Sequence, residues 1–218
     1  MTASRVHFVE QLESLQRDIR TLAEDVDERL GEAFGVLESR DASLANDIVE
    51  GDHAINMRRH ELEQECVRLL AEQAPVAGDL RLTVAALFAA TELERVGDYA
   101  VAIARIASDI PGDASLPFLG DIQSMGEQAR AMLRSAVSAL LERDAAVARD
   151  LARQDEAVDA AQQEIFARIV DRERVADAFE ACAETLWIVH NIERVADRAT
   201  NIAERALYVT TGEVAELN

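Results

Sequence analysis

The chain has 218 residues and a formal net charge of −20, since 42 acidic residues are set against 22 basic ones. All 22 basic residues are arginine, because the sequence contains no lysine. Nucleic acids and anionic lipid surfaces attract basic proteins, so this composition argues against both as partners. It favours cations or a basic protein surface instead.

Hydrophobic residues make up 49% of the chain, with only three prolines and nine glycines. Few chain breakers and a large apolar fraction predict an all-α protein with long helices and a sizeable core. No apolar run approaches the roughly 20 residues of a spanning helix, and no basic-then-apolar leader opens the chain. We therefore expect a soluble, cytoplasmic protein. Cys66 and Cys182 fit neither a zinc site nor a disulfide framework, so we expect buried free thiols.

Three helices are predicted in the first half of the chain. Apolar residues recur at steps of three and four from Phe8 to Leu37, which is typical of one long amphipathic helix. Asp41 is expected to cap a second helix that ends at Pro75. A third helix is predicted over 79–109.

The strongest break lies at the middle of the chain, between Pro111 and Pro117. Three more helices are predicted after it, over 118–143, 144–171 and 177–211. Asp177 with Glu180 resembles a capping box at the start of the last one. Three helices on each side of the break predict two domains, residues 1–111 and residues 112–218.

A short motif is repeated on the third helix of each half. The stretch Leu93–Asp98, LERVGD, matches Ile192–Asp197, IERVAD, 99 positions later. An offset of nearly half the chain indicates an internal repeat. The sequence therefore predicts two tandem, pseudo-symmetric three-helix bundles.

Each copy of the motif carries two acidic residues four positions apart, which places both side chains on one helix face. The preceding helix of each half carries a similar pair of polar residues. Folding each pair of helices at its break would bring these residues level on antiparallel neighbours. The expected facing pairs are Asp52 with Asp98, Asn56 with Glu94, Asp155 with Asp197, and Asp159 with Glu193.

Facing carboxylates repel one another, so we expect a cation between them, either a metal ion or an arginine. Oxygen ligands suit hard or borderline ions such as magnesium, calcium, manganese or iron. The columns point away from the apolar stripe, which predicts that they lie on the outside of each bundle. An ordinary solvated acidic face is the alternative, since a chain with 42 acidic residues produces such pairs often.

Nothing in the sequence looks like the reacting group of an enzyme. It has no Gly-x-Ser-x-Gly motif and no glycine-rich phosphate loop, and it lacks the Glu-x-x-His pairs of di-iron bundles. His190 lies one turn before Glu193 and could reach the acidic column, although a surface histidine without a role is the simpler interpretation. We expect a non-catalytic protein with no organic cofactor.

The repeated motif, together with Val49–Asp52, Pro75–Arg81 and Tyr208–Glu213, resembles the pattern of the PhoU family, nearly from end to end. The resemblance implies a cytoplasmic protein, often a homodimer, that negatively regulates phosphate uptake and the phosphate-starvation (Pho regulon) response. The partners that it implies are the ATPase subunit of a phosphate ABC transporter and a phosphate-sensing histidine kinase. The protein would meet the membrane only through them.

The resemblance also implies metal sites, because some family members bind iron or other metal ions at the acidic motifs. Candidate ions are iron, magnesium, manganese, calcium and zinc. Carried over to this sequence, the ligands are Asp155, Asp159, Glu193, Asp197 and Asn201 in the second half, and Asp52, Glu94 and Asp98 in the first. Asn56 and Ala102 depart from the second-half pattern, so the first half is the weaker candidate.

Two other functions remain open from the sequence. One is an accessory regulator of a different inorganic phosphate permease, and the other is a metal-binding helical-bundle enzyme. Outward-facing carboxylates argue against the enzyme, because they would not shield a substrate from water. Beyond the core stripes no face is conspicuously apolar, so the residues themselves leave the oligomeric state open.

Overall fold

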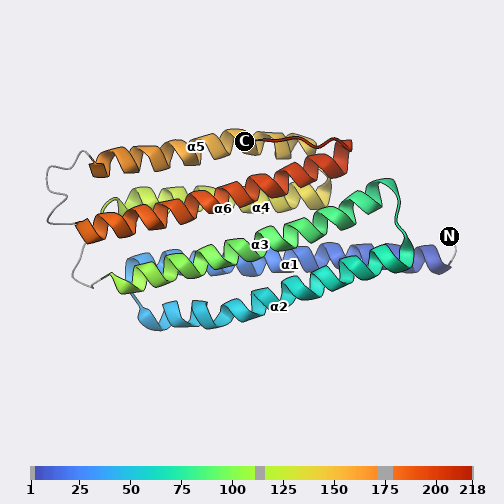
Figure 1. The fold of residues 1–218 in the computed structure, drawn as a ribbon, viewed down its shortest axis with the longest axis horizontal. Coiled ribbons are helices and arrows are strands. Elements are labelled where there is room, and N and C mark those ends of the chain that lie inside the picture. The colour runs from blue at the N-terminus through green and yellow to red at the C-terminus, as the bar shows by residue number, and fades with distance from the viewer. Residues whose placement is uncertain (1–2, 111–115, 171–178, 218) are drawn as a thin grey trace.

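The computed structural model describes residues 3–110, 116–170 and 179–217. These residues form six α-helices and no strand, which confirms the predicted all-α class. Helices that follow one another in the chain run antiparallel in Figure 1. They are α1 (Ala3–Ser39), α2 (Ala42–Gln73), α3 (Ala77–Asp109), α4 (Leu119–Glu142), α5 (Ala145–Val170) and α6 (Phe179–Thr211).

Local chemistry explains several of the helix ends. Asp41 caps α2, because its Oδ1 accepts hydrogen bonds from the backbone N–H groups of Ser43 and Leu44 at 2.8 and 3.3 Å. Asp144 caps α5 in the same way. Gly212 follows the last residue of α6 with a φ of 81°, a left-handed conformation that favours glycine.

Two sequence predictions fall outside the described residues. One is the capping box that begins at Asp177, and the other is the domain boundary between residues 111 and 112. The helices on either side of that boundary form two three-helix groups, α1–α3 and α4–α6. The boundary itself stays a prediction.

The two bundles share one core. They meet through α3 against α6 and through α1 against α4, so four helices form the centre. In Figure 1, α3 and α6 run side by side along the middle, while α2 and α5 form opposite edges. Buried apolar residues from Leu12 to Val209 belong to a single continuous cluster. The sequence predicted the two bundles, but not this extensive contact between them.

An ion-pair cluster and a close contact join α1 to α4. The Asp27 carboxylate accepts hydrogen bonds from Arg130 Nε at 2.9 Å and from Arg134 Nη1 at 3.0 Å. Four positions before Arg130, Gly126 lies against the buried ring of Phe34. These contacts fix the position of the first bundle against the second.

Gly126 is needed for the close approach of α4 to α1. A Cβ atom at this position would lie 2.7 Å from Cζ of Phe34. We expect Gly126→Ala to lower the free energy of unfolding by about 1–3 kcal/mol, because the ring or the helix must shift. Gly120→Ala is the matched control in the same helix, since nothing lies within 4 Å of its Cβ, and it should be neutral or stabilising. Denaturant unfolding followed by circular dichroism measures both variants, and equal stabilities would contradict the tight contact.

Both cysteines are buried free thiols, as the sequence predicts. Burial, with the nearby charges of Glu65 and Glu63, raises the pKa of Cys66 to about 12, so this thiol stays protonated and unreactive. None of the described helices has the length and hydropathy of a membrane span.

Candidate functional site

The acidic residues of the second half come together where α5 packs on α6. Asp155 and Asp159 project from α5 toward Glu193 and Asp197 on α6, in the pairs that the antiparallel hairpin predicts. We call these four residues the second carboxylate cluster. The Asp155 residue is only 7% exposed, and the side chains of Glu193 and Asp197 are each 19% exposed. The packing of α5 on α6 buries Asp155 and leaves the other three partly exposed, so the predicted position on the outside of the bundle is wrong for Asp155.

Burial and mutual repulsion raise the pKa values of Asp155, Asp159 and Glu193. The pKa of Asp155 rises to about 6, first because burial penalises its charged form and then because Asp159 and Asp197 repel it. The nearby Thr200 hydroxyl offsets part of this rise in pKa. Burial also raises the pKa values of Asp159 and Glu193, each with repulsion from Asp197. The folded protein therefore holds these side chains ionised at a cost.

The stability of the protein should fall as the pH rises across this window. The pKa of Asp155 is about 6 in the folded protein and 3.8 ordinarily, so folding favours its protonated form. Its full stabilising effect is present below about pH 4, is lost as the pH rises to about 6, and is absent above that. We expect Asp155→Asn, measured with a chelator present, to raise the free energy of unfolding at pH 7 by about 1–3 kcal/mol. The variant should also flatten the fall between about pH 4 and pH 6, and an unchanged pH profile would contradict the assignment.

Two arginines neutralise part of this charge, and a histidine lies beside it. Arg194 donates to Asp197 Oδ2 at 2.9 Å, and Arg198 Nη2 lies 3.6 Å from the same oxygen. His190 Nδ1 lies 3.3 Å from Glu193 Oε2. The arginine alternative from the sequence is therefore realised at Asp197. Asp155 Oδ1, by contrast, is buried and accepts no hydrogen bond from the described part of the chain.

The first half carries a weaker version of the same arrangement between α2 and α3. The pKa of Glu94 is raised by burial, by Asp98 and by Asp52, and the pKa of Asp98 is raised by burial and by Asp52. Asn56 donates to Asp52 Oδ2 at 2.8 Å, so the amide supplies a donor where the second half has an acid. Arg59 Nε lies 3.5 Å from Glu94 Oε1. The acidic residues of the first half therefore have less need of an added cation than the second carboxylate cluster.

Asn201, the fifth predicted ligand of the second half, contacts the other bundle. Its amide donates to Glu92 Oε2 on α3 at 3.2 Å, across the contact between the two bundles. Arg198 donates to the same carboxylate oxygen at 3.2 Å. Asn201 thus takes part in the joint between the bundles, and its role as a metal ligand stays a prediction.

The donor set suits a hard cation, although it is not assembled around one point. Asp52 Oδ1 and Asp155 Oδ1 are buried oxygens that accept no hydrogen bond within the described ranges, and an oxygen-binding ion would satisfy them. However, the structure as described contains no group of three or more His, Cys, Asp or Glu side chains arranged to hold a metal ion. Binding would therefore require the carboxylates to rotate toward one another.

Most of the chain matches a known protein family. The PhoU domain model matches the chain twice, over residues 19–107 and 122–206, so each bundle is one copy. The chain belongs to the PhoU family. Each PhoU copy carries one acidic motif, and each motif faces the preceding helix of its own bundle.

Known PhoU proteins match over nearly the whole chain. The phosphate-specific transport system accessory protein PhoU homolog of Streptococcus pneumoniae is 32% identical, with 98% of this chain and 100% of that protein covered. The crystal structure of PhoU from Pseudomonas aeruginosa has a TM-score of 0.86 at 28% identity, covering 94% of this chain and 100% of that one. The phosphate transport system regulatory protein PhoU from Streptococcus pneumoniae has a TM-score of 0.85 at 30% identity, covering 95% and 99%.

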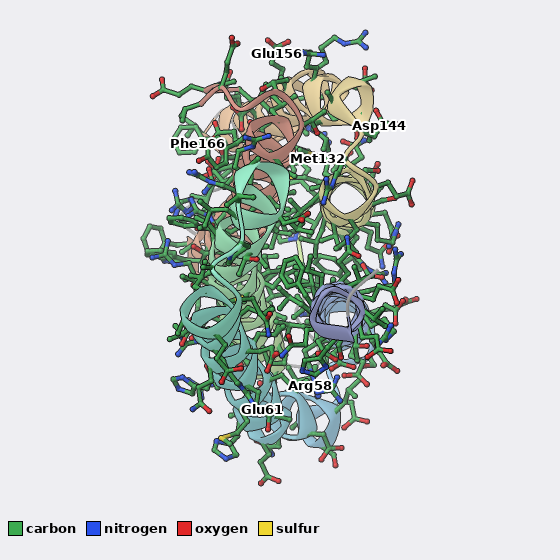
Figure 2. All side chains as sticks on the ribbon, turned by 90° about the vertical axis from the view of Figure 1, so that its right-hand side faces the viewer. Arg58, Glu61, Met132, Asp144, Glu156 and Phe166 are labelled. Atoms are coloured by element: carbon green, nitrogen blue, oxygen red, sulfur yellow. The ribbon has the colours of Figure 1, made fainter. Side chains whose placement is uncertain are left out.

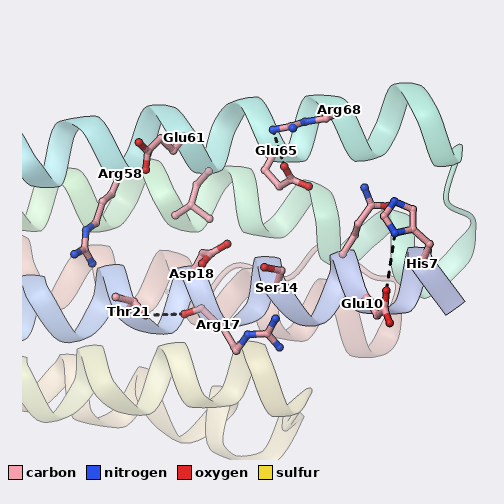
Figure 3. Close-up of a pocket in the computed structure, with 12 residues that line it drawn as sticks. His7, Glu10, Ser14, Arg17, Asp18, Thr21, Arg58, Glu61, Glu65 and Arg68 are labelled. Atoms are coloured by element: carbon pink, nitrogen blue, oxygen red, sulfur yellow. Dashed lines mark hydrogen bonds and ion pairs between the residues drawn. The ribbon is translucent and has the colours of Figure 1, made fainter.

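A polar groove of about 710 Å³ between α1 and α2 lies apart from both PhoU motifs. Figure 3 shows arginine and acidic side chains of both helices around it. Glu65 and Arg68 pair at 2.7 Å, and His7 lies 3.9 Å from Glu10. Arg58 also forms an ion pair, with Asp25 of α1. Because much of its charge is paired internally, this groove is not the candidate site.

Sequence reasoning missed the residues that link the PhoU motif to the other bundle. Arg198 and Glu92 belong to the joint between α3 and α6, which single-helix spacing does not reveal. Arg59 was missed too, although it lies seven positions after Asp52 and hence on the same face of α2. That spacing is the one signal that could have found it.

Proposed function

We propose that this protein is an accessory regulator of a phosphate-specific transport system. It would repress phosphate uptake and the phosphate-starvation response when phosphate is plentiful, by coupling an ABC transporter to a sensor histidine kinase. The observation that carries the proposal is the end-to-end match to PhoU accessory proteins, with both repeats keeping their acidic motif. The proposal includes a homodimer, which light scattering of the purified protein measures independently.

In this role the protein would act by binding its partners and would catalyse no reaction. Its acidic residues between α2 and α3 and between α5 and α6, together with its charge of −20, suit recognition of basic surfaces or cations. The resemblance to the PhoU family implies neither a catalytic nucleophile nor an organic cofactor. The two proposed partners are the ATPase subunit of the transporter and the phosphate-sensing kinase.

Co-purification tests the proposed partners. The tagged chain is expressed with a phosphate ABC transporter and its sensor kinase, and the retained proteins are identified after washing at moderate salt. We expect the ATPase subunit and the kinase to be retained. Retention of an inorganic phosphate permease in their place would favour the alternative regulator, and retention of none of them would contradict the proposal.

We also propose that the second carboxylate cluster binds a metal ion. Asp155, Asp159, Glu193 and Asp197 would supply oxygen ligands, and the unpaired Asp155 Oδ1 supports this choice. The first-half residues Asp52, Glu94 and Asp98 would bind more weakly, since Asn56 and Arg59 already satisfy part of that site. Candidate ions are iron, manganese, magnesium, calcium and zinc.

Thermal unfolding with added metal tests this second proposal. An ion that binds only the folded chain adds about 2.7 kcal/mol to the free energy of unfolding when its free concentration is about 100 times its Kd. We therefore expect manganese or ferrous iron to raise the Tm of the wild-type protein at pH 7, and to raise that of Asp155→Asn much less. Equal increases in both proteins would place the ion elsewhere, and no increase with any of the five ions would contradict the site.

A further inference from the structure

An apolar groove opens between the C-terminal half of α5 and the N-terminal half of α6. It has a volume of about 620 Å³, and its walls include Phe166 from α5 and Leu186, Trp187 and Val189 from α6. Phe166 is 55% exposed and Trp187 is 62% exposed. Figure 2 shows Phe166 at the periphery of the second bundle, whereas Met132 lies inside it. Large exposed aromatic side chains gathered in one hollow are typical of interaction sites.

The groove leads directly into the second carboxylate cluster. On α6, His190 lines the groove and lies 3.3 Å from Glu193, while its ring lies 6.2 Å from that of Trp187. On α5, Gln162 lines the groove one turn after Asp159. Trp187 therefore precedes Glu193 and Asp197 by six and ten residues, which is about 9–15 Å along a helix. One continuous surface has an apolar end and an acidic end.

We propose that this surface binds an amphipathic, basic segment of a partner protein. The apolar residues of the segment would occupy the groove beside Trp187 and Phe166. Its arginine or lysine side chains, about 9–15 Å further along, would meet the carboxylates of Glu193 and Asp197. The inference rests on the proposed function, because the segment would belong to a subunit of the regulated transport system.

Charge selects this occupant over two others. A second copy of the chain also carries a charge of −20, so its approach to this acidic cluster is unfavourable, and the proposed homodimer would use another face. A basic segment is attracted. An anionic membrane surface is repelled for the same reason. A basic segment with apolar anchors is the one partner that complements both ends of the surface.

A model peptide tests the inference without the transport system. The helical peptide carries leucine and phenylalanine on one face of its first half and arginine on the same face of its second half. Trp187 is the only tryptophan of the chain, so its fluorescence reports contact directly. We expect peptide binding to shift the emission to shorter wavelengths, and we expect the affinity to fall at high salt.

Two variants separate the groove from the rest of the surface. We expect Phe166→Ser with Trp187→Ser to weaken binding of the labelled peptide by about tenfold or more, measured by anisotropy. Phe88→Ser is the matched control, because Phe88 is 45% exposed on α3, away from the groove. It should bind as the wild type does. Circular dichroism establishes that each variant is folded.

Several results would overturn the inference. These are no peptide binding by the wild type, equal binding by the groove variant, or equal binding of a peptide with glutamate in place of arginine. If the wild type forms a dimer or binds neutral lipid vesicles, and only the groove variant loses that property, the groove belongs to a second copy or to a lipid surface instead. A protein that binds the peptide but does not repress phosphate-starvation genes would contradict the proposed function and leave the groove assignment standing.

Discussion

Replacing both Glu193 and Asp197 with Ala should abolish repression while leaving the protein folded. In high phosphate we expect starvation-gene expression to rise to the level of a host that lacks any PhoU protein. The two residues supply the α6 side of the second carboxylate cluster, so their loss removes both the proposed metal ligands and the acidic end of the proposed docking surface. Stability should hold or increase, because the repulsion on Asp155 and Asp159 is relieved.

A charge-matched variant distinguishes the site from general acidity. Glu24 and Glu28 are exposed on α1, and like Glu193 and Asp197 they are four positions apart. Their joint replacement with Ala changes the net charge equally and should leave repression intact. If a folded Glu193→Ala, Asp197→Ala protein still represses, or if the α1 variant fails equally, the cluster has no specific role.

Removing Arg198 should cause a large loss of stability. Its side chain is 10% exposed and donates at 3.2 Å to Glu92, whose side chain is 15% exposed, across the joint between α3 and α6. Without the guanidinium, Glu92 keeps one described donor, Asn201, in a poorly hydrated position. We expect Arg198→Ala to lower the free energy of unfolding by about 2–4 kcal/mol, as for other buried charges that lose their partner. Denaturant unfolding at neutral pH measures the change.

Two comparisons make this prediction specific. Arg194→Ala removes an arginine that is 36% exposed from the same helix, and it should cost less than about 1 kcal/mol. The double variant Glu92→Met, Arg198→Met should lose much less stability than Arg198→Ala, because no unpaired buried charge then remains. A single Arg198→Ala change that costs no more than Arg194→Ala would show that the joint does not depend on this pair.

The sequence predicted the elements of the fold well, because local signals control them. The apolar stripe of α1, the Asp41 cap and the break at Pro75 act within a few residues, and the structure has all three. The shared core across α3 and α6 was not predictable in this way. The helices α3 and α6 bury small residues such as Ala89 and Ala199, and sequence spacing does not tell which neighbouring helix covers such a residue.

The candidate site was predicted in part. Hairpin geometry placed Asp155 opposite Asp197 correctly, because antiparallel helices of similar length fix the level of each residue. The burial of Asp155 was missed, since a helical wheel treats each helix alone and does not include the neighbour that covers it. The apolar groove was missed for a related reason. Phe166 and Trp187 are single apolar positions on different helices, and only the packing of α5 on α6 brings them together.

A reporter assay tests the central proposal most directly. The gene is expressed in a bacterial host that lacks its own PhoU protein but keeps its phosphate ABC transporter and sensor kinase, and alkaline phosphatase is measured in high phosphate. An accessory regulator of this pathway should restore repression, and the Glu193→Ala, Asp197→Ala variant should not. Full phosphatase activity despite well-expressed, folded wild-type protein would contradict the proposed regulation of this system.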